Sequence, residues 1–245
     1  NAVSLDNSVA LYQKWRNTLR FLLANLPSEA PSTGASSGWW NAERWTVSQA
    51  RMFRSRVVGF LREANTDMAV EAMHTWCQQL SNHSFMMVKD RLYCGNADER
   101  AAAHAMLREV LVEFSAALHC LLPCTWSEAQ AYLPAWWGEG MDRAENVTVD
   151  PSWEAWYALR EQVAVLWSAH SVKGSLVWGN VRVGMLPSEL GKDEALQWFG
   201  VSGLTVVGDD EALSVSVMDG ELCDRCRMVS VGVCLFCAAR EKCAT

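Results

Sequence analysis

Apolar residues recur at intervals of three and four through the first half of the chain, which is the spacing of amphipathic helices. In the first helix the apolar face comprises Tyr12, Trp15, Leu19, Leu22 and Leu26. The predicted helices lie at residues 8–26, 67–80 and 98–122, another helix contains residues 45–62, and a short element lies at 84–94. We therefore predict a mainly α fold that begins with a helical bundle.

The spacing of apolar and polar residues changes after residue 137. A proline-started helix is predicted at 151–170, and alternation of apolar and polar residues then predicts strands. The later elements are strands at 175–183, 203–207 and 212–218 and a short helix at 187–199. We predict three parts: a bundle at 1–137, a linker helix with a small α+β domain at 138–220, and a separate tail at 221–245.

The tail holds the most chemically specific pattern in the chain. Cys223 and Cys226 form one C-x-x-C, and seven residues later Cys234 and Cys237 form another. Two such turns can place four thiolates around one Zn²⁺ ion, which closes the tetrahedron and makes the site structural. The alternatives are two disulfides or four unrelated buried cysteines. Cys243 could replace one of the ligands.

Composition favours the metal over disulfides. The chain has 245 residues and is 50% hydrophobic, so it can build its own core, whereas disulfide frameworks belong to short secreted chains. We expect a reducing environment and no membrane-spanning helix. The cysteines outside the tail are predicted to be small core residues, namely Cys77, Cys94, Cys120 and Cys124.

Charge is distributed unevenly along the chain. The formal net charge is −7, but residues 1–62 carry +5 and the remaining residues carry −12. The basic segment is either an RNA-facing surface or a set of solvated helix faces. Adjacent tryptophans at 39–40 and 136–137 could stack on nucleobases or bury against protein.

Several short blocks, in order, resemble the isoleucyl-tRNA synthetases. Residues 12–26 (YQKWRNTLRFLLANL) are similar to the opening of that family's anticodon-binding helical domain. Residues 89–94 (KDRLYC) resemble the segment before the long fifth helix, and residues 121–129 (LLPCTWSEA) resemble the passage into the last bundle helix. The helix at 153–173 and the terminal cysteine pairs follow in the family's order.

This resemblance implies an anticodon-binding bundle that contacts tRNA, followed by a zinc-binding tail. The implied metal ligands are Cys223, Cys226, Cys234 and Cys237. The candidate RNA-binding residues are Arg16, Arg20, Arg51, Arg54, Lys89 and Arg91.

The chain has no recognisable catalytic constellation. It lacks the His-Ile-Gly-His and Lys-Met-Ser-Lys-Ser signatures that the resemblance would require of a catalytic domain, and it has no Gly-rich phosphate loop. The five histidines show no mutual ligand spacing, so none is assigned as a base. We therefore predict that the chain alone is not an enzyme.

Three functions stay open. The prediction is a non-catalytic, RNA-binding or architectural module of synthetase origin within a larger assembly, such as an organellar ribosome. One alternative is the tRNA-binding part of an active isoleucyl-tRNA synthetase whose catalytic domain is a separate chain or absent. The other is a protein scaffold without RNA. The expected partners are RNA and protein subunits, in a mitochondrial or other organellar matrix or in the cytoplasm.

Overall fold

The computed structural model describes most of the chain and groups it into two compact units. The described residues are 2–30, 35–137, 147, 149, 152–169, 179–184, 191–207, 212–223 and 229–230. The first unit comprises residues 1–39, 43–85 and 98–148, and the second comprises residues 40–42, 86–97 and 149–245. Residues 40–42 and 86–97 thus group with the C-terminal half, although both lie inside the predicted 1–137 bundle.

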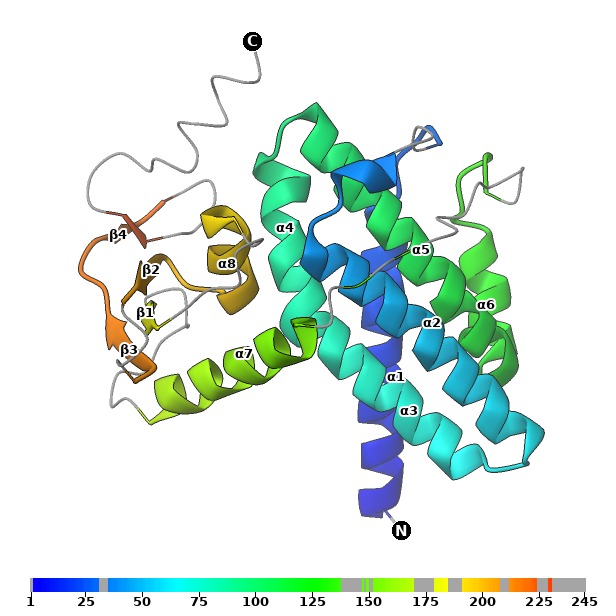
Figure 1. The fold of residues 1–245 in the computed structure, drawn as a ribbon. Helices are drawn as coiled ribbons and strands as arrows, with labels where there is room; N and C mark the ends of the chain where they lie inside the picture. The colour runs from blue at the N-terminus through cyan, green and yellow to red at the C-terminus, as the bar shows by residue number, and fades with distance from the viewer. Residues whose placement is uncertain are drawn as a thin grey trace. The chain divides into compact units, whose positions relative to one another are not determined.

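The first unit is helical, as predicted (Figure 1). Its helices are α1 (Ala2–Ala24), α2 (Asn41–Arg62), α3 (Thr66–Gln79), α5 (Ala97–Leu121) and α6 (Pro123–Gln130), with a 3₁₀ turn at Ala35–Gly38. Helix α1 begins six residues earlier than the apolar stripe indicated. The stripe could not reveal this first segment because Asp6 and Asn7 are exposed there, so no burial imposes an apolar pattern.

Aromatic packing joins three helices of this unit. Phe53 of α2 stacks on Trp76 of α3 with ring centroids 5.5 Å apart, and it lies 6.3 Å from the ring of Phe114 of α5. All three side chains are buried. Because each aromatic side chain buries a large apolar area, this contact contributes to the hydrophobic stabilisation of the bundle.

The third predicted helix continues beyond its expected end. A five-residue π-helical segment, Leu80–Ser84, connects α3 directly to α4 (Phe85–Cys94). The Ser84 hydroxyl is buried and lies 3.0 Å from the Thr46 hydroxyl of α2. That hydrogen bond satisfies two polar groups in an apolar setting, which is the usual requirement for burying them.

The predicted core cysteines divide into two kinds. Cys77 and Cys94 are buried, as expected, but Cys120 and Cys124 are exposed free thiols at the junction of α5 and α6. The prediction was wrong for this second pair because Cys120 lies off the buried stripe at the end of α5, and Cys124 lies in the exposed first turn of α6, after Pro123. Burial raises the pKa of the Cys77 thiol to about 12, so it stays protonated at neutral pH.

The second unit contains a three-stranded sheet in the order β2-β1-β3. Strand β1 (Gly179–Val183) runs parallel to β2 (Gly203–Val206) and antiparallel to β3 (Ser214–Val217). Helix α8 (Lys192–Phe199) lies between β1 and β2 in the sequence and makes the crossover that a parallel pair requires. Val181, Val183 and Val215 form the buried face of the sheet.

Tryptophans form the core of this unit together with α7 (Trp153–Ser168). The rings of Trp153 and Trp198 lie 4.9 Å apart, and the indole N–H of Trp198 donates to the Trp156 carbonyl at 3.2 Å. The guanidinium of Arg160 lies 5.3 Å from the Trp198 ring. Burial lowers the pKa of Arg160 to about 10, so the side chain remains cationic at neutral pH.

A short antiparallel pair lies near the C-terminus, with β4 (Glu221–Leu222) against β5 (Val229–Ser230). Within the residues placed by the structure, no helix is long and apolar enough to cross a membrane.

Candidate nucleic-acid interface

Two of the six predicted RNA-binding residues lie on the outer side of α1. Trp15 and Leu19 are buried, which fixes the rotation of the helix and directs Arg16 and Arg20 away from the core. The Arg16 side chain is 51% exposed and lies 3.7 Å from the Glu128 carboxylate of α6. Arg20 is exposed and forms no ion pair in the described part of the chain.

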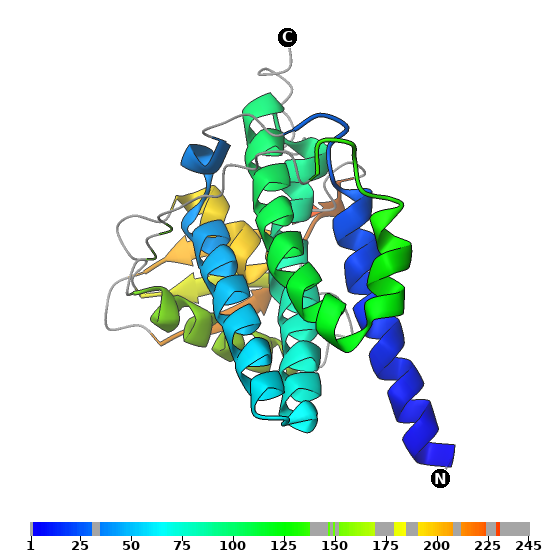
Figure 2. The same cartoon turned by 90° about the vertical axis from the view of Figure 1, so that its right-hand side faces the viewer.

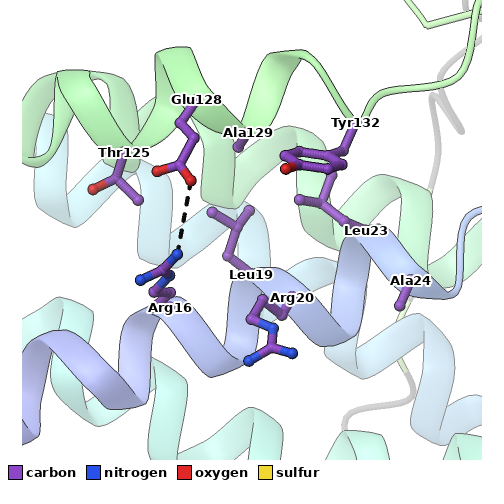
Figure 3. Close-up of a pocket in the computed structure, with 9 residues that line it drawn as sticks. All are labelled: Arg16, Leu19, Arg20, Leu23, Ala24, Thr125, Glu128, Ala129 and Tyr132. Carbon is purple, nitrogen blue, oxygen red and sulfur yellow. Dashed lines mark ion pairs between the residues drawn. The ribbon is translucent and has the colours of Figure 1, made fainter.

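A pocket of about 430 Å³ lies between α1 and α6. Leu19, Leu23, Ala24 and Ala129 supply its apolar lining, and polar side chains surround them (Figure 3). The polar lining residues are Arg16, Arg20, Thr125, Glu128 and Tyr132. Tyr132 is 71% exposed. An apolar floor with a few convergent polar groups is the usual form of a binding site.

One hydrogen bond joins the two helices that form the pocket, and two others tie down the segment that follows α1. The hydroxyls of Tyr12 and Thr125 lie 3.3 Å apart and join α1 to α6. Nδ1 of His104 lies 2.8 Å from the Asn25 carbonyl, so this nitrogen carries the proton that it donates. The indole N–H of Trp136 donates to the Pro27 carbonyl at 3.1 Å. The pocket is therefore built on tied elements rather than on free loops.

Sequence reasoning missed Thr125, Glu128 and Tyr132 as site residues. Their spacing of three and four places them on one face of α6 and the turn that follows it, a signal present in the sequence. The sequence did not show which helix packs against that face of α6. Only the packing of α6 on α1 brings Tyr132 next to Leu23, in a pocket that Arg20 also lines.

Two further candidates, Arg51 and Arg54 of α2, have carboxylate partners within the bundle. Arg51 lies 3.6 Å from Glu109, and Arg54 lies 3.3 Å from Glu113, both of α5. The two glutamates are buried, and Glu109 also accepts a hydrogen bond from Arg108 at 3.0 Å. Since these arginines neutralise buried carboxylates, they have less charge to offer a phosphate.

The last two candidates lie on α4 and differ in exposure. Lys89 is exposed, so its ammonium can reach a ligand. Arg91 is only 2% exposed, and its guanidinium lies 4.4 Å from the centre of the Trp40 ring. The structure therefore gives Arg91 a packing role. The sequence alone could not show that Arg91 is buried while Lys89, two residues before it, is exposed.

The tryptophan pairs pack against their own chain. Trp39 is buried and donates its indole N–H to the Ala102 carbonyl at 3.0 Å, while Trp40 lies against Arg91. Trp136 and Trp137 have ring centroids 6.0 Å apart. Most of the 13 tryptophans are buried in the two units. Protein contact thus accounts for their abundance better than base stacking does.

Of the four predicted zinc ligands, only Cys223 belongs to the described residues, where its partly exposed side chain follows β4 directly. Cys226, Cys234, Cys237 and the spare Cys243 lie outside them. No cluster of three or more potential metal ligands occurs among the residues with a described placement.

Comparison with known proteins agrees with the resemblance. Residues 43–164 match the family model for the anticodon-binding domain of tRNA ligases. An isoleucine–tRNA ligase of Brevibacillus brevis is 26% identical over 94% of this chain, and one of Halalkalibacterium halodurans is 28% identical over 90%. The ligase of Bacillus cereus is 27% identical over 92%. The chain spans about 28% of the length of each relative.

These matches confirm the resemblance to the anticodon-binding part of the isoleucine–tRNA ligases. The matched family domain is the anticodon-binding one, and its first residue, Glu43, lies in α2. The pocket-lining residues of α6 fall within the matched range, whereas α1 precedes it.

Proposed function

We propose that this chain binds tRNA for isoleucine. The premise is that residues 43–164 carry an anticodon-binding domain of the kind found in tRNA ligases. The pocket between α1 and α6 supports this role, because it combines an exposed aromatic ring with two arginines and an apolar floor. A nucleobase that leaves its stack needs an aromatic or apolar surface, and the adjoining phosphates need cations.

In this proposal the residues of the pocket have distinct roles. Tyr132 stacks on an unpaired base, and Arg20 contacts a neighbouring phosphate. Arg16 lies 3.7 Å from the Glu128 carboxylate, which offsets part of its charge at the pocket edge. Lys89 of α4 does not line this pocket, so a phosphate contact there stays a separate prediction.

The proposed function is non-catalytic. The chain binds RNA, and aminoacylation needs a catalytic domain that this sequence does not contain. The alternative is that the chain is the tRNA-binding part of an active ligase, and recovery of a catalytic polypeptide with the purified chain would establish it. Membership of an organellar assembly stays a prediction that the same purification would test.

Zinc is proposed as the structural ion of the tail, held by Cys223, Cys226, Cys234 and Cys237. The pairing of β4 with β5 supports this assignment, because Leu222 opposes Val229 and the first C-x-x-C lies between them. The two strands thus bring the ends of that segment together, as a tight metal-binding turn requires. The thiolates would supply a closed coordination shell and folding energy.

The test of tRNA binding is equilibrium titration of the intact chain with isoleucine tRNA. Tyr132→Ala should weaken binding by about 1–3 kcal/mol, the usual worth of base stacking, whereas Tyr132→Phe should retain it. Arg20→Gln should weaken binding and make its dependence on salt shallower by about one unit.

Arg51→Gln is the matched control, because Glu109 keeps Arg108 as a partner and the bundle is retained. It should leave the affinity unchanged. Equal losses for Arg20→Gln and Arg51→Gln would show that general charge, and not the pocket, binds the RNA. Full retention of binding by Tyr132→Ala would contradict the stacking role.

A further inference from the structure

Four of the five arginines of α2 divide into two sets with different surroundings, and the fifth, Arg44, donates to the Trp39 carbonyl. Arg51 and Arg54 lie beside the buried glutamates of α5. Arg56 and Arg62 are exposed and have neither an ion pair nor a hydrogen bond among the described residues. Neither of the latter two was a candidate in the sequence, where all the arginines of this helix look alike.

The second set shares one side of the helix. At 100° per residue, Met52, Ser55, Arg56, Gly59 and Arg62 fall within a sector of about 120°, here called the α2 outer face. Met52, Ser55, Arg56 and Arg62 are exposed. Apart from the nearby backbone of α2, a Cβ atom added at Gly59 would meet no atom within 4 Å, so none of the described residues covers the centre of this face.

Nearby acidic residues affect the two arginines unequally. Glu63 and Asp67 are exposed close to Arg62 in the sequence, around the turn between α2 and α3. Arg56 lies almost two helical turns before Glu63. The positive potential of the face is therefore centred on Arg56, with Arg62 partly offset.

We propose that the α2 outer face is a second RNA contact, which binds the phosphodiester backbone through Arg56 and Arg62. The inference rests on the proposed tRNA binding and adds a surface to it. Figure 2 shows α2 and α5 neighbouring on one side of the bundle, with α1 and α6 beside each other on another. This face is therefore distinct from the pocket, and an RNA that occupies both must extend around the bundle.

The chemistry favours backbone over base recognition. The face offers two guanidinium groups, one hydroxyl and a glycine that permits close approach, but it has no exposed aromatic ring for stacking. Phosphate contacts release counterions, so each arginine that makes one contributes to the salt dependence of binding.

The test compares salt dependence of tRNA binding by the intact chain across four Arg→Gln variants. Arg56→Gln should make the log–log salt slope shallower by about one unit, Arg62→Gln by less, and both should keep the unfolding midpoint of the parent chain. Arg51→Gln and Arg54→Gln should keep the slope, while Arg54→Gln lowers the unfolding midpoint.

Each outcome has a separate meaning. Absence of tRNA binding by the parent chain overturns the proposed function and this inference together. Binding that Arg20→Gln weakens, with an unchanged slope for the Arg56→Gln, Arg62→Gln double variant, overturns this inference alone. A slope that changes equally for Arg51 and Arg56 variants overturns the division of α2 into two sets.

Discussion

At the residue scale, charge and partner decide the role of each arginine. Arg16, Arg51 and Arg54 each lie within 4 Å of a carboxylate, Arg91 is buried against Trp40, and Arg20 is exposed and without an ion pair among the residues that the structure places. The sequence correctly indicated that α1 presents cations. It could not separate structural from exposed arginines on α2, because Glu109 and Glu113 are more than fifty positions away.

The pair of Arg54 and Glu113 should stabilise the fold. Arg54→Gln leaves the buried Glu113 carboxylate without its cation, and we expect a loss of about 1–3 kcal/mol in the free energy of unfolding. Glu113→Gln should cost less, since the remaining Arg54 is half exposed and can be solvated. Chemical denaturation measures both.

A double-mutant cycle supplies the control. If the two side chains interact as the 3.3 Å distance indicates, Arg54→Gln combined with Glu113→Gln should cost less than the sum of the single changes. Strict additivity would mean that the ion pair contributes nothing to folding.

Cys77 should make stability sensitive to alkaline pH. Burial raises the pKa of its thiol from 9.0 to about 12 in the folded chain. Below pH 9 the thiol is neutral in both states and its contribution is fully present. Between pH 9 and about 12 the unfolded chain loses the proton first, so stability is lost as the pH rises.

At pH 10.5 this effect amounts to about 2 kcal/mol. The measurement is the free energy of unfolding of the parent chain and of Cys77→Ala from pH 7 to pH 10.5, where the difference between the two should narrow as the pH rises. A constant difference would show that Cys77 does not stay protonated in the folded state.

At the element scale, apolar periodicity predicted the position of most helices and strands, but it did not predict which of them pack against one another. The predicted helices at 67–80 and 98–122 correspond to α3 and α5 within one residue, because both bury a continuous stripe. Helix α1 was predicted too short where it is exposed. The sequence did not predict the π-helical segment that connects α3 to α4. An extra residue in one helical turn changes the spacing of apolar residues only slightly.

The β4–β5 pair makes a testable link between backbone geometry and the proposed zinc site. Gly220 precedes β4 with φ of +148°, and a Cβ atom there would lie 2.7 Å from the Ser230 carbonyl oxygen. Gly220→Ala should therefore disturb the pairing and weaken zinc retention. Zinc content per chain, measured by elemental analysis after gel filtration, checks this.

Gly59→Ala is the control, because open space surrounds that position. It should leave zinc content unchanged. Removal of zinc by a chelator should unfold the tail while the helical bundle retains its circular dichroism. A parent chain that carries no zinc when purified under reducing conditions would overturn the metal assignment.

At the scale of the whole molecule, an acidic chain presents exposed basic side chains on particular helices because its charges are distributed unevenly. The net charge of −7 would disfavour RNA if it were uniform, but exposed cations of α1 and α2 lie in the first unit. Sequence reasoning found this asymmetry from the charge count. The pocket could be identified only from the structure, because its two walls are about one hundred residues apart in the sequence.

The most direct test of the central claim is titration of the intact chain with isoleucine tRNA at several salt concentrations. We predict saturable binding that is weakened when the anticodon loop is altered and when Tyr132 is replaced by Ala, but not when Arg51 is replaced by Gln. Binding that is equal for any RNA of the same length, or no binding at low salt, would contradict the account.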